Sequence, residues 1–337
     1  MRSDPDDWRR LWIGRRRRVV SRLIVALSFQ AAAAHAQSGS STDGALFLLL
    51  PVGARAVGMG QAMVADQPGT EAVWWNPSAI ARQDKKEIGI HHSQTIAATG
   101  DAITILYPTA GVGALALSVN VLNFGDQQIT APGGVPIGVV LPRNILFAAT
   151  YGAALGKRIN AGVTYKRLQY RVDCSGQCTN VSTFTATSSA VDFGAQYDVP
   201  TESTLTLGAA VRNIGTRLQV NDREQADPLP TRIEVGAEYK LPFIAALVAD
   251  TEVRVAAAVI SDTDIDHPAA RIGADLAYEK NIHLRGGYVA NDANGARTAL
   301  GFGVVAGRLM FDIARTFGGL SSDAGQTPTY LSLRYLF

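Results

Sequence analysis

Fourteen extended segments of about ten residues follow one another from Lys86 to the end of the chain. Several alternate apolar and polar side chains, which is the pattern of a strand with one face in an apolar environment. About ten residues is also the length that a tilted strand needs to cross a bilayer. The segments are 86–96, 101–107, 113–124, 144–155, 159–171, 184–199, 203–214, 231–241, 251–261, 270–279, 282–290, 297–306, 308–316 and 329–337.

The last segment ends on an aromatic residue, Phe337, with Tyr335 two positions before it on the same apolar face. This ending is typical of outer-membrane β-barrels, whose last strand closes against the first. Tyr335 and Phe337 are therefore the predicted assembly signal for the barrel-assembly machinery. A soluble sandwich that finishes on a strand is the alternative at this point.

The connections between segments favour the barrel. Those after even-numbered segments are mostly tight, such as 156–158 and 280–281, whereas those after odd-numbered segments are longer and polar, such as 125–143, 216–230 and 317–328. Short turns on one side and long loops on the other are the outer-membrane pattern, with the short side toward the periplasm. Five tyrosines fall in the apolar phase near the ends of descending segments, as an aromatic girdle requires, although β-propensity alone could place them there. They are Tyr107, Tyr197, Tyr239, Tyr278 and Tyr335.

The first 36 residues read as a secretory signal peptide. Arginines, including the run 15–18, precede an apolar stretch over 19–29 and a small-residue site that ends at Ala36. Without them, Lys plus Arg falls from 31 to 23 and Asp plus Glu from 29 to 26, so the net charge changes from +2 to near −3. Nothing in that balance argues for a nucleic-acid partner. After residue 36 no run of eighteen apolar residues occurs, which argues against a helical membrane protein.

Residues 37–85, between this leader and the barrel of residues 86–337, do not read as strand. Glycines interrupt the segment, yet it carries large apolar side chains, and fourteen strands enclose a space that side chains alone would not fill. We therefore predict a plug that folds back into the lumen, and an all-β, fourteen-stranded antiparallel transmembrane β-barrel around it. Its apolar residues could line a ligand pocket or only pack the plug against the wall. They are Met59, Met63, Trp74, Trp75 and Ile80.

Two motifs in this segment resemble the N-terminal signature of the PorV/PorQ proteins, relatives of the FadL transporters. The first is Gly-Ala-Arg-Ala-Val-Gly-Met-Gly-Gln-Ala over 53–62, which contains Gly58 and Gly60, and the second is Trp-Asn-Pro-Ser-Ala-Ile-Ala over 75–81, which contains Asn76 and Pro77. The signature is usually written with Ala-Met-Gly-Gly-Ala and Asn-Pro-Ala-Gly-Leu, so Gln61 and residues 78–80 depart from it.

The resemblance implies two functions in the outer membrane. A PorV-like protein works with the secretion machinery, so its partners would be secretion-system proteins. A FadL-like protein passively carries hydrophobic small molecules, such as long-chain fatty acids, through a lumen whose plug moves. Outer-membrane lipid surrounds the barrel in either case. The resemblance implies no enzyme and no cofactor.

The remaining polar signals have simple interpretations. Charges of both signs in the inward phase could pair across strands or form an ion path, and pairing is favoured because the signs nearly balance. Cys174 and Cys178, four apart in an exported loop, predict a disulfide rather than a metal site. A dinucleotide-like pattern over 301–306 runs into another strand instead of a helix, so its glycines more simply thin one strand face. No catalytic motif of a lipase or zinc protease occurs.

Overall fold

The computed structural model describes residues 44–66, 69–109, 111–178, 183–200, 204–219, 226–242, 244, 248–262, 268–290, 295–319, 325 and 327–337. The predicted signal peptide therefore lies outside the described residues. None of the helices in these ranges is long and apolar enough to cross a membrane.

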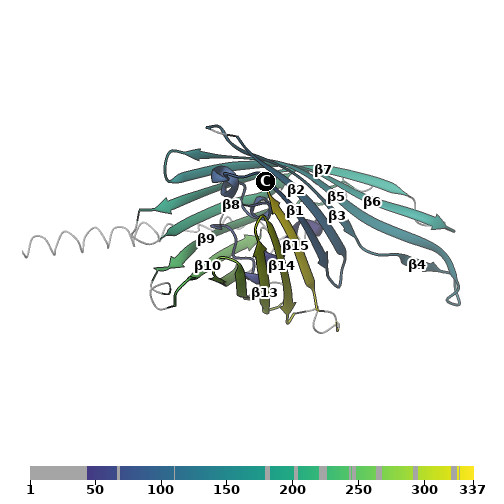
Figure 1. Cartoon of the computed structure of the whole chain (residues 1–337). Coiled ribbons are helices and arrows are strands. Elements are labelled where there is room, and N and C mark those ends of the chain that lie inside the picture. Colours follow the sequence, from purple (N-terminus) through teal and green to yellow (C-terminus); the bar gives the residue numbers. More distant parts are fainter. Residues whose placement is uncertain are drawn as a thin grey trace, which may run out of the picture. The chain divides into compact units, whose positions relative to one another are not determined.

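The described strands form one closed antiparallel ring of fourteen, as the sequence predicts (Figure 1). Neighbours in the chain pair with each other, β3 pairs with β5, and β1 pairs with β15 to close the ring. A fifteenth strand, β4 (Gln127–Thr130), lies only along β5. The ring consists of β1 (Glu87–Gln94), β2 (Thr99–Thr109), β3 (Gly113–Asn123), β5 (Pro136–Leu155), β6 (Ile159–Gly176), β7 (Phe184–Val199), β8 (Leu205–Gly215), β9 (Arg232–Leu241), β10 (Thr251–Asp262), β11 (Ala269–Tyr278), β12 (Ile282–Ala290), β13 (Arg297–Ala306), β14 (Leu309–Phe317) and β15 (Thr329–Leu336).

The last strand closes the ring in the register that its alternation requires. Tyr335 lies opposite Ile88 of β1, and the backbone N–H of Phe337 donates to the carbonyl of Lys86 at 2.9 Å. The Tyr335 and Phe337 rings meet edge to face with their centroids 5.0 Å apart. The terminal aromatic residues therefore lie at the seam of the barrel, on its short-turn end.

The two faces of the wall differ as the alternation predicts. The outward face is apolar, and side chains such as Ile105, Leu117 and Phe147 are about half exposed on it. The five girdle tyrosines lie in outward positions near the short-turn ends of descending strands. The inward face carries the charged residues. This is the division expected when lipid surrounds the wall.

Two strands, β5 and β6, are much longer than the sequence indicates. The sequence places the start of β5 at Asn144, but the strand begins at Pro136, and β6 continues past Arg171 to Gly176. Together with β4 and β7 they extend from one side of the ring (Figure 1). The sequence does not indicate the extension of β5, because Pro142 lies within it and proline usually interrupts a strand. It is tolerated where the partner of β5 changes from β3 to β4 and the register shifts by one residue.

Candidate functional site

Residues 44–66 and 69–85, here called the N-terminal segment, run along the inside of the ring from the long-loop end to the short-turn end. At its start, the N–H of Gly44 donates to the carbonyl of Pro228, in the long connection between β8 and β9. At its end, Arg82 pairs with Asp198 near the end of β7, at 2.5 Å. The segment contains four short helices: η1 (Leu46–Leu49), α2 (Ala54–Gly58), η2 (Ala72–Trp74) and η3 (Pro77–Arg82).

Strand glycines receive the N-terminal segment. A Cβ on Gly287 would lie 2.7 Å from the carbonyl carbon of Met59, and one on Gly208 would lie 2.5 Å from that of Val64, closer than real Cβ atoms come. The wall and the segment are therefore in backbone contact, which only glycine permits. Within the described part of the chain, six strand glycines make such backbone contacts with the segment: Gly152, Gly162, Gly208, Gly273, Gly287 and Gly301. Three more contact its side chains: Gly89, Gly194 and Gly236.

Two glycines of the family signature, Gly58 and Gly60, contribute the segment's side of these contacts. Gly58 lies against Gly301 of β13. Gly60 adopts a left-handed φ of 59°, and a Cβ there would lie 2.6 Å from the carbonyl oxygen of Ile272. Both glycines therefore let the turn after α2 touch the wall.

Asn76 and Pro77 start η3 and fix its position. The Asn76 side-chain oxygen accepts from the N–H and hydroxyl of Ser78 at 3.0 and 2.7 Å, which caps the helix, and its NH₂ group donates to the carbonyl of Val64 at 2.5 Å. Pro77 occupies the first helical position, where its missing N–H costs nothing. The Asn-Pro pair thus joins the two halves of the segment.

The five predicted pocket residues are buried and packed. Met63 and Ile80 have no exposed surface, and Met59 is 4% exposed. Trp74 and Trp75 line a cavity of only about 20 Å³ beneath η1, little more than one water molecule needs. In this conformation the five side chains are packed against inward side chains of the wall, and whether a hydrophobic ligand can enter among them stays a prediction.

Trp75 is held by polar groups around its ring. Its Nε1–H donates to the carbonyl of Val52 at 3.1 Å, and the guanidinium groups of Arg212 and Arg271 lie 5.4 and 5.8 Å from the ring centre. Arg212 also donates to the carbonyl of Trp74 at 2.8 Å. Neither arginine was identified from the sequence, because the inward phase of β8 and β11 gives no sign of which group each one meets.

Hydrogen bonds hold α2 and Thr70 near the seam of the barrel. Glu71 accepts from the N–H of Ala56 at 3.0 Å, where the helix leaves its first N–H groups unpaired. The N–H of Ala54 donates to the hydroxyl of Ser332 on β15 at 2.8 Å, and His91 Nδ1 lies 2.9 Å from the same hydroxyl. Glu87 of β1 accepts from the N–H and hydroxyl of Thr70.

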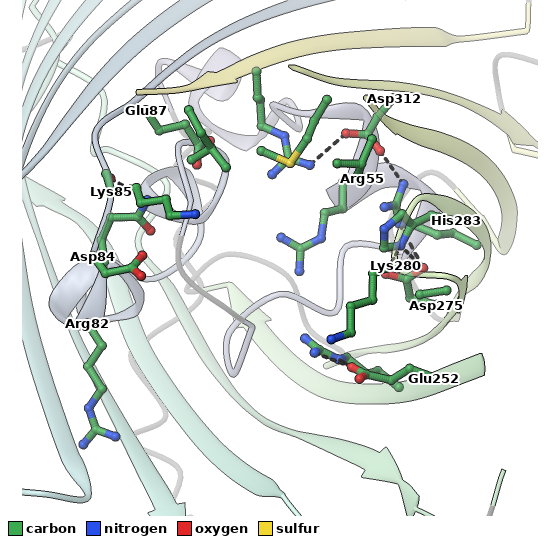
Figure 2. Close-up of a pocket in the computed structure, with 18 residues that line it drawn as sticks. Arg55, Arg82, Asp84, Lys85, Glu87, Glu252, Asp275, Lys280, His283 and Asp312 are labelled. Atoms are coloured by element: carbon green, nitrogen blue, oxygen red, sulfur yellow. Dashed lines mark hydrogen bonds and ion pairs between the residues drawn. The ribbon is translucent and has the colours of Figure 1, made fainter. Parts of the chain in front are cut away.

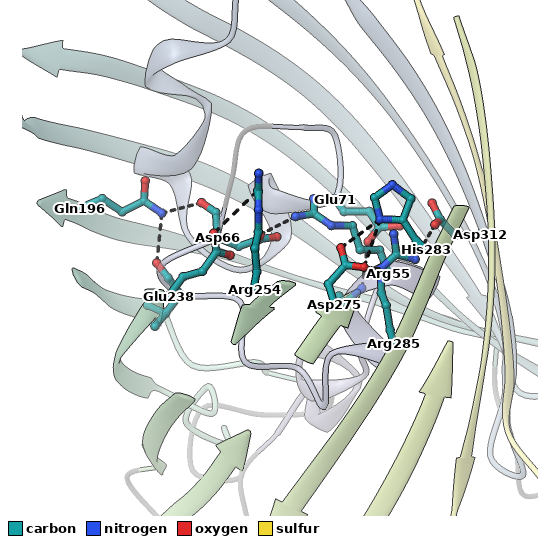
Figure 3. A network of polar contacts seen from close by, with 12 residues as sticks. Arg55, Asp66, Glu71, Gln196, Glu238, Arg254, Asp275, His283, Arg285 and Asp312 are labelled. Carbon is teal, nitrogen blue, oxygen red and sulfur yellow. Dashed lines mark hydrogen bonds and ion pairs between the residues drawn. The ribbon is translucent and has the colours of Figure 1, made fainter. Parts of the chain in front are cut away.

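Arg55 extends from α2 toward a set of acidic groups (Figure 3). It pairs with Asp66 at 2.5 Å. Burial opposes its charge, but the carboxylates of Asp66, Asp275, Glu71 and Glu238 outweigh that effect and raise the pKa of the guanidinium. The positive charge of Arg55 is therefore permanent. Its ion pair is with Asp66 of the same segment, and Glu238 of β9 and Asp275 of β11 stabilise the charge from the wall.

The inward charges of the wall pair across strands, as predicted. Asp312 of β14 accepts from Arg285 of β12 at 2.6 Å and from Arg334 of β15 at 2.9 Å. Asp192 pairs with Lys166 at 2.6 Å. Each of these buried charges has an opposite partner one or two strands away, which reduces the cost of removing it from water.

A cavity of about 560 Å³ lies at the short-turn end, beneath α2 (Figure 2). Arg55, Lys85 and Lys280 extend into it, and Asp275 and Asp312 form part of its wall. Cations and carboxylates are both present, and most of the carboxylates already bond to strand arginines or to His283. The cavity is thus lined by charges of both signs, with seven Arg and Lys side chains and five Asp and Glu side chains.

Cys174 and Cys178 are joined by a disulfide at the long-loop end of β6. Within the described ranges, no three His, Cys, Asp or Glu side chains are grouped so that they could hold a metal ion.

Comparison with known proteins identifies the family. The chain matches the family described as type IX secretion system protein PorV over residues 33–261. It belongs to the PorV family. The sequence resemblance to PorV/PorQ proteins is thereby confirmed, and the chain is an outer-membrane β-barrel protein. No curated protein sequence matches it.

Solved structures show the same fold in transporters. The toluene transporter TodX of Pseudomonas putida is 12% identical, with 85% of this chain and 96% of that chain covered and a TM-score of 0.56. For the toluene transporter TbuX of Ralstonia pickettii the identity is 12%, the coverage 86% and 100%, and the TM-score 0.57. A Pseudomonas aeruginosa FadL homologue reaches 11% identity, coverage of 85% and 98%, and a TM-score of 0.50. At this identity the likeness concerns the fold alone.

Proposed function

We propose that this PorV-family barrel is a non-enzymatic component of protein secretion that acts through its surfaces, with its lumen closed and its short-turn end in the periplasm. The observation that supports this most is the backbone contact between the N-terminal segment and the strand glycines. A segment seated by six such backbone contacts cannot slide aside without losing many of them together. A secretion partner has no need of an open lumen.

Passive transport of hydrophobic small molecules, as in FadL-like proteins, is the second candidate. It is supported by the fold of the toluene transporters and by η1, whose Leu48 and Leu49 are half-buried at the long-loop end. Transport would require the N-terminal segment to move, since Trp74 and Trp75 leave about 20 Å³ between them and η1. The closed lumen therefore favours the secretion role.

An enzymatic role is disfavoured by the arrangement closest to a catalytic triad. Ser332, His91 and Glu71 lie together in the lumen, but Ser332 and Glu71 both face Nδ1 of His91, at 2.9 and 3.6 Å. A triad needs the hydroxyl on one ring nitrogen and the carboxylate on the other. The Ser332 hydroxyl also accepts from Ala54, so it holds the segment instead of acting as a nucleophile.

Two further steps belong to the same proposal. Residues 1–36 direct export and are removed, and the assembly machinery recognises the exposed terminal Phe337 beside Tyr335. Cleavage is testable by N-terminal sequencing of the protein from purified outer membranes. A first residue other than Gln37 would contradict the assigned site.

The two functions predict different molecules bound to the purified barrel. Whole cells are cross-linked, the barrel is purified, and both cross-linked proteins and extractable small molecules are identified by mass spectrometry. The secretion role predicts proteins of the secretion machinery and no stoichiometric apolar ligand. One fatty acid or aromatic hydrocarbon per barrel, without a cross-linked secretion protein, would overturn the proposal in favour of transport. A variant lacking residues 50–81 serves as the control in which any lumen ligand should be lost.

A further inference from the structure

The outward surface contains a groove that crosses four strands. Two adjacent rows of the sheet form it. In one row Ile105 of β2, Leu117 of β3, Ala149 of β5 and Tyr165 of β6 lie opposite one another in turn. Ala149 is much smaller than its neighbours, and the surface is hollowed to about 580 Å³ around it.

The second row ends on a charge. Ile103, Val119 and Phe147 lie opposite one another in turn, and Arg167 of β6 completes the row beside Phe147. The groove walls are otherwise apolar, so a guanidinium at one end makes the groove amphipathic. An occupant must match both parts.

Arg167 is held in place by hydroxyl groups of β7. Its two terminal NH₂ groups donate to Ser189 at 3.0 Å and Thr187 at 2.9 Å, and the Tyr165 hydroxyl lies 3.1 Å from the Ser189 hydroxyl. A guanidinium has five N–H donors, so three are left. The side chain is therefore fixed and still able to bind an anion in the planar geometry that arginine offers to phosphate.

The height of Arg167 matches the outer boundary of the membrane. Ile159, at the short-turn rim, lies opposite the girdle residue Tyr197. Arg167 is eight residues further along β6, which at about 3.3 Å per residue and a tilt of roughly 40° places it about 20 Å above the rim. The apolar band of such barrels is about 25 Å tall, and a long side chain can reach its edge. Arg143, exposed on β5, lies opposite Arg171, which is four residues beyond Arg167 on β6. This pair lies at the level where the lipid head groups begin.

We propose that this groove binds a phosphate-bearing acylated lipid of the outer leaflet, with an acyl chain along Leu117, Ala149 and Phe147 and a phosphate on Arg167. The charge at the boundary argues for a lipid rather than an apolar strand or helix of a neighbouring protein, which would leave Arg167 facing hydrocarbon. The site is on the outside of the wall and is independent of the proposed function of the lumen.

Native mass spectrometry of the purified full-length barrel tests the site, with diphosphoryl lipid A and its dephosphorylated form as probes. The barrel should retain the diphosphoryl form about tenfold better, because charge-assisted hydrogen bonds to phosphate are strong. Arg167→Gln should remove this preference, and Ala149→Leu, which fills the hollow, should weaken both forms. Arg315→Gln and Ala257→Leu are the matched controls, since both residues are outward and exposed on distant strands. Equal retention by all variants would overturn the site.

A second measurement does not depend on the variants folding. A photoreactive amino acid replaces Val119, within the groove, and is activated by light in intact cells grown with labelled phosphate. A labelled lipid adduct is the expected product. A protein adduct would mean that the groove is a protein interface and would overturn the proposal.

Discussion

Gly286 and Gly287 are neighbours in β12 that face opposite sides of the wall. Substituting each in turn therefore distinguishes the effect of a side chain on the strand itself from its effect on the contact with the N-terminal segment. A Cβ on Gly286 would meet nothing within 4 Å. A Cβ on Gly287 would overlap the backbone nitrogen of Gly60 and lie 2.7 Å from the carbonyl carbon of Met59, whereas ordinary contact begins at 3.4 Å. Gly287→Ala is therefore the perturbation, and Gly286→Ala is its matched control.

The expected free energies follow from these distances. Both substitutions restrict the unfolded chain in the same way, which stabilises a compatible strand by roughly 0.4–1 kcal/mol. Only Gly287→Ala adds an overlap, and overpacking costs about 1–3 kcal/mol. Because the entropic gain is common to both, the unfolding free energy of the two variants should differ by about 1–3 kcal/mol.

Heat-modifiable migration on gels, recorded over a series of temperatures, measures this difference, and planar bilayers measure conductance. Gly287→Ala should unfold at a lower temperature than Gly286→Ala and show transient openings as the N-terminal segment loosens. Gly286→Ala should match or exceed the unchanged protein and stay closed. Identical unfolding temperatures and equally silent bilayers would refute the idea that the strand glycines seat the segment.

Three other outcomes are expected. Removing residues 50–81 should leave a barrel that inserts but conducts, because the deletion takes away Trp74 and Trp75; conductance no higher than that of the intact barrel would show that the inward side chains close the lumen alone. Deleting Phe337 should lower the folded amount in membranes, since the seam loses its bond to Lys86; unchanged amounts on the heat-modifiability gel would contradict this. Replacing Cys174 and Cys178 by serine should speed protease cleavage of the β6–β7 loop on intact cells without changing the unfolding temperature, and a lowered temperature would mean that the disulfide supports the wall itself.

The barrel could be read from the sequence because the bilayer imposes a simple rule. One face of each strand must be apolar and each strand must be long enough to cross, so alternation and length suffice wherever lipid lies outside. This rule applies only to the parts of the strands that lie within the membrane. The outer parts of β5 and β6 lie beyond this constraint, and their mixed composition and Pro142 concealed them.

The contents of the lumen were less predictable, because lipid imposes no pattern on side chains inside the barrel. The sequence shows that residues 37–85 are broken by glycine and rich in large apolar side chains, but not where the segment starts. The sequence predicts that the segment folds back into the lumen, but not that Gly44 lies at the long-loop end beside Pro228. The strand glycines were visible in the sequence, and only those over 301–303 were interpreted as thinning a strand face. Gly301 does receive Gly58, but nothing in the sequence links Gly208 to Val64 or Gly287 to Gly60.

The balance of polar and apolar contacts in the lumen bears on which function the barrel can have. An apolar plug in an apolar lumen could shift by small steps, because dispersion contacts are not directional. Here the N-terminal segment is held by directional bonds to Ser332, Glu87 and Arg212, and an incomplete shift would leave these groups buried and unpaired. We therefore expect opening to break these bonds together, which fits the proposed secretion role better than continuous passage of small molecules.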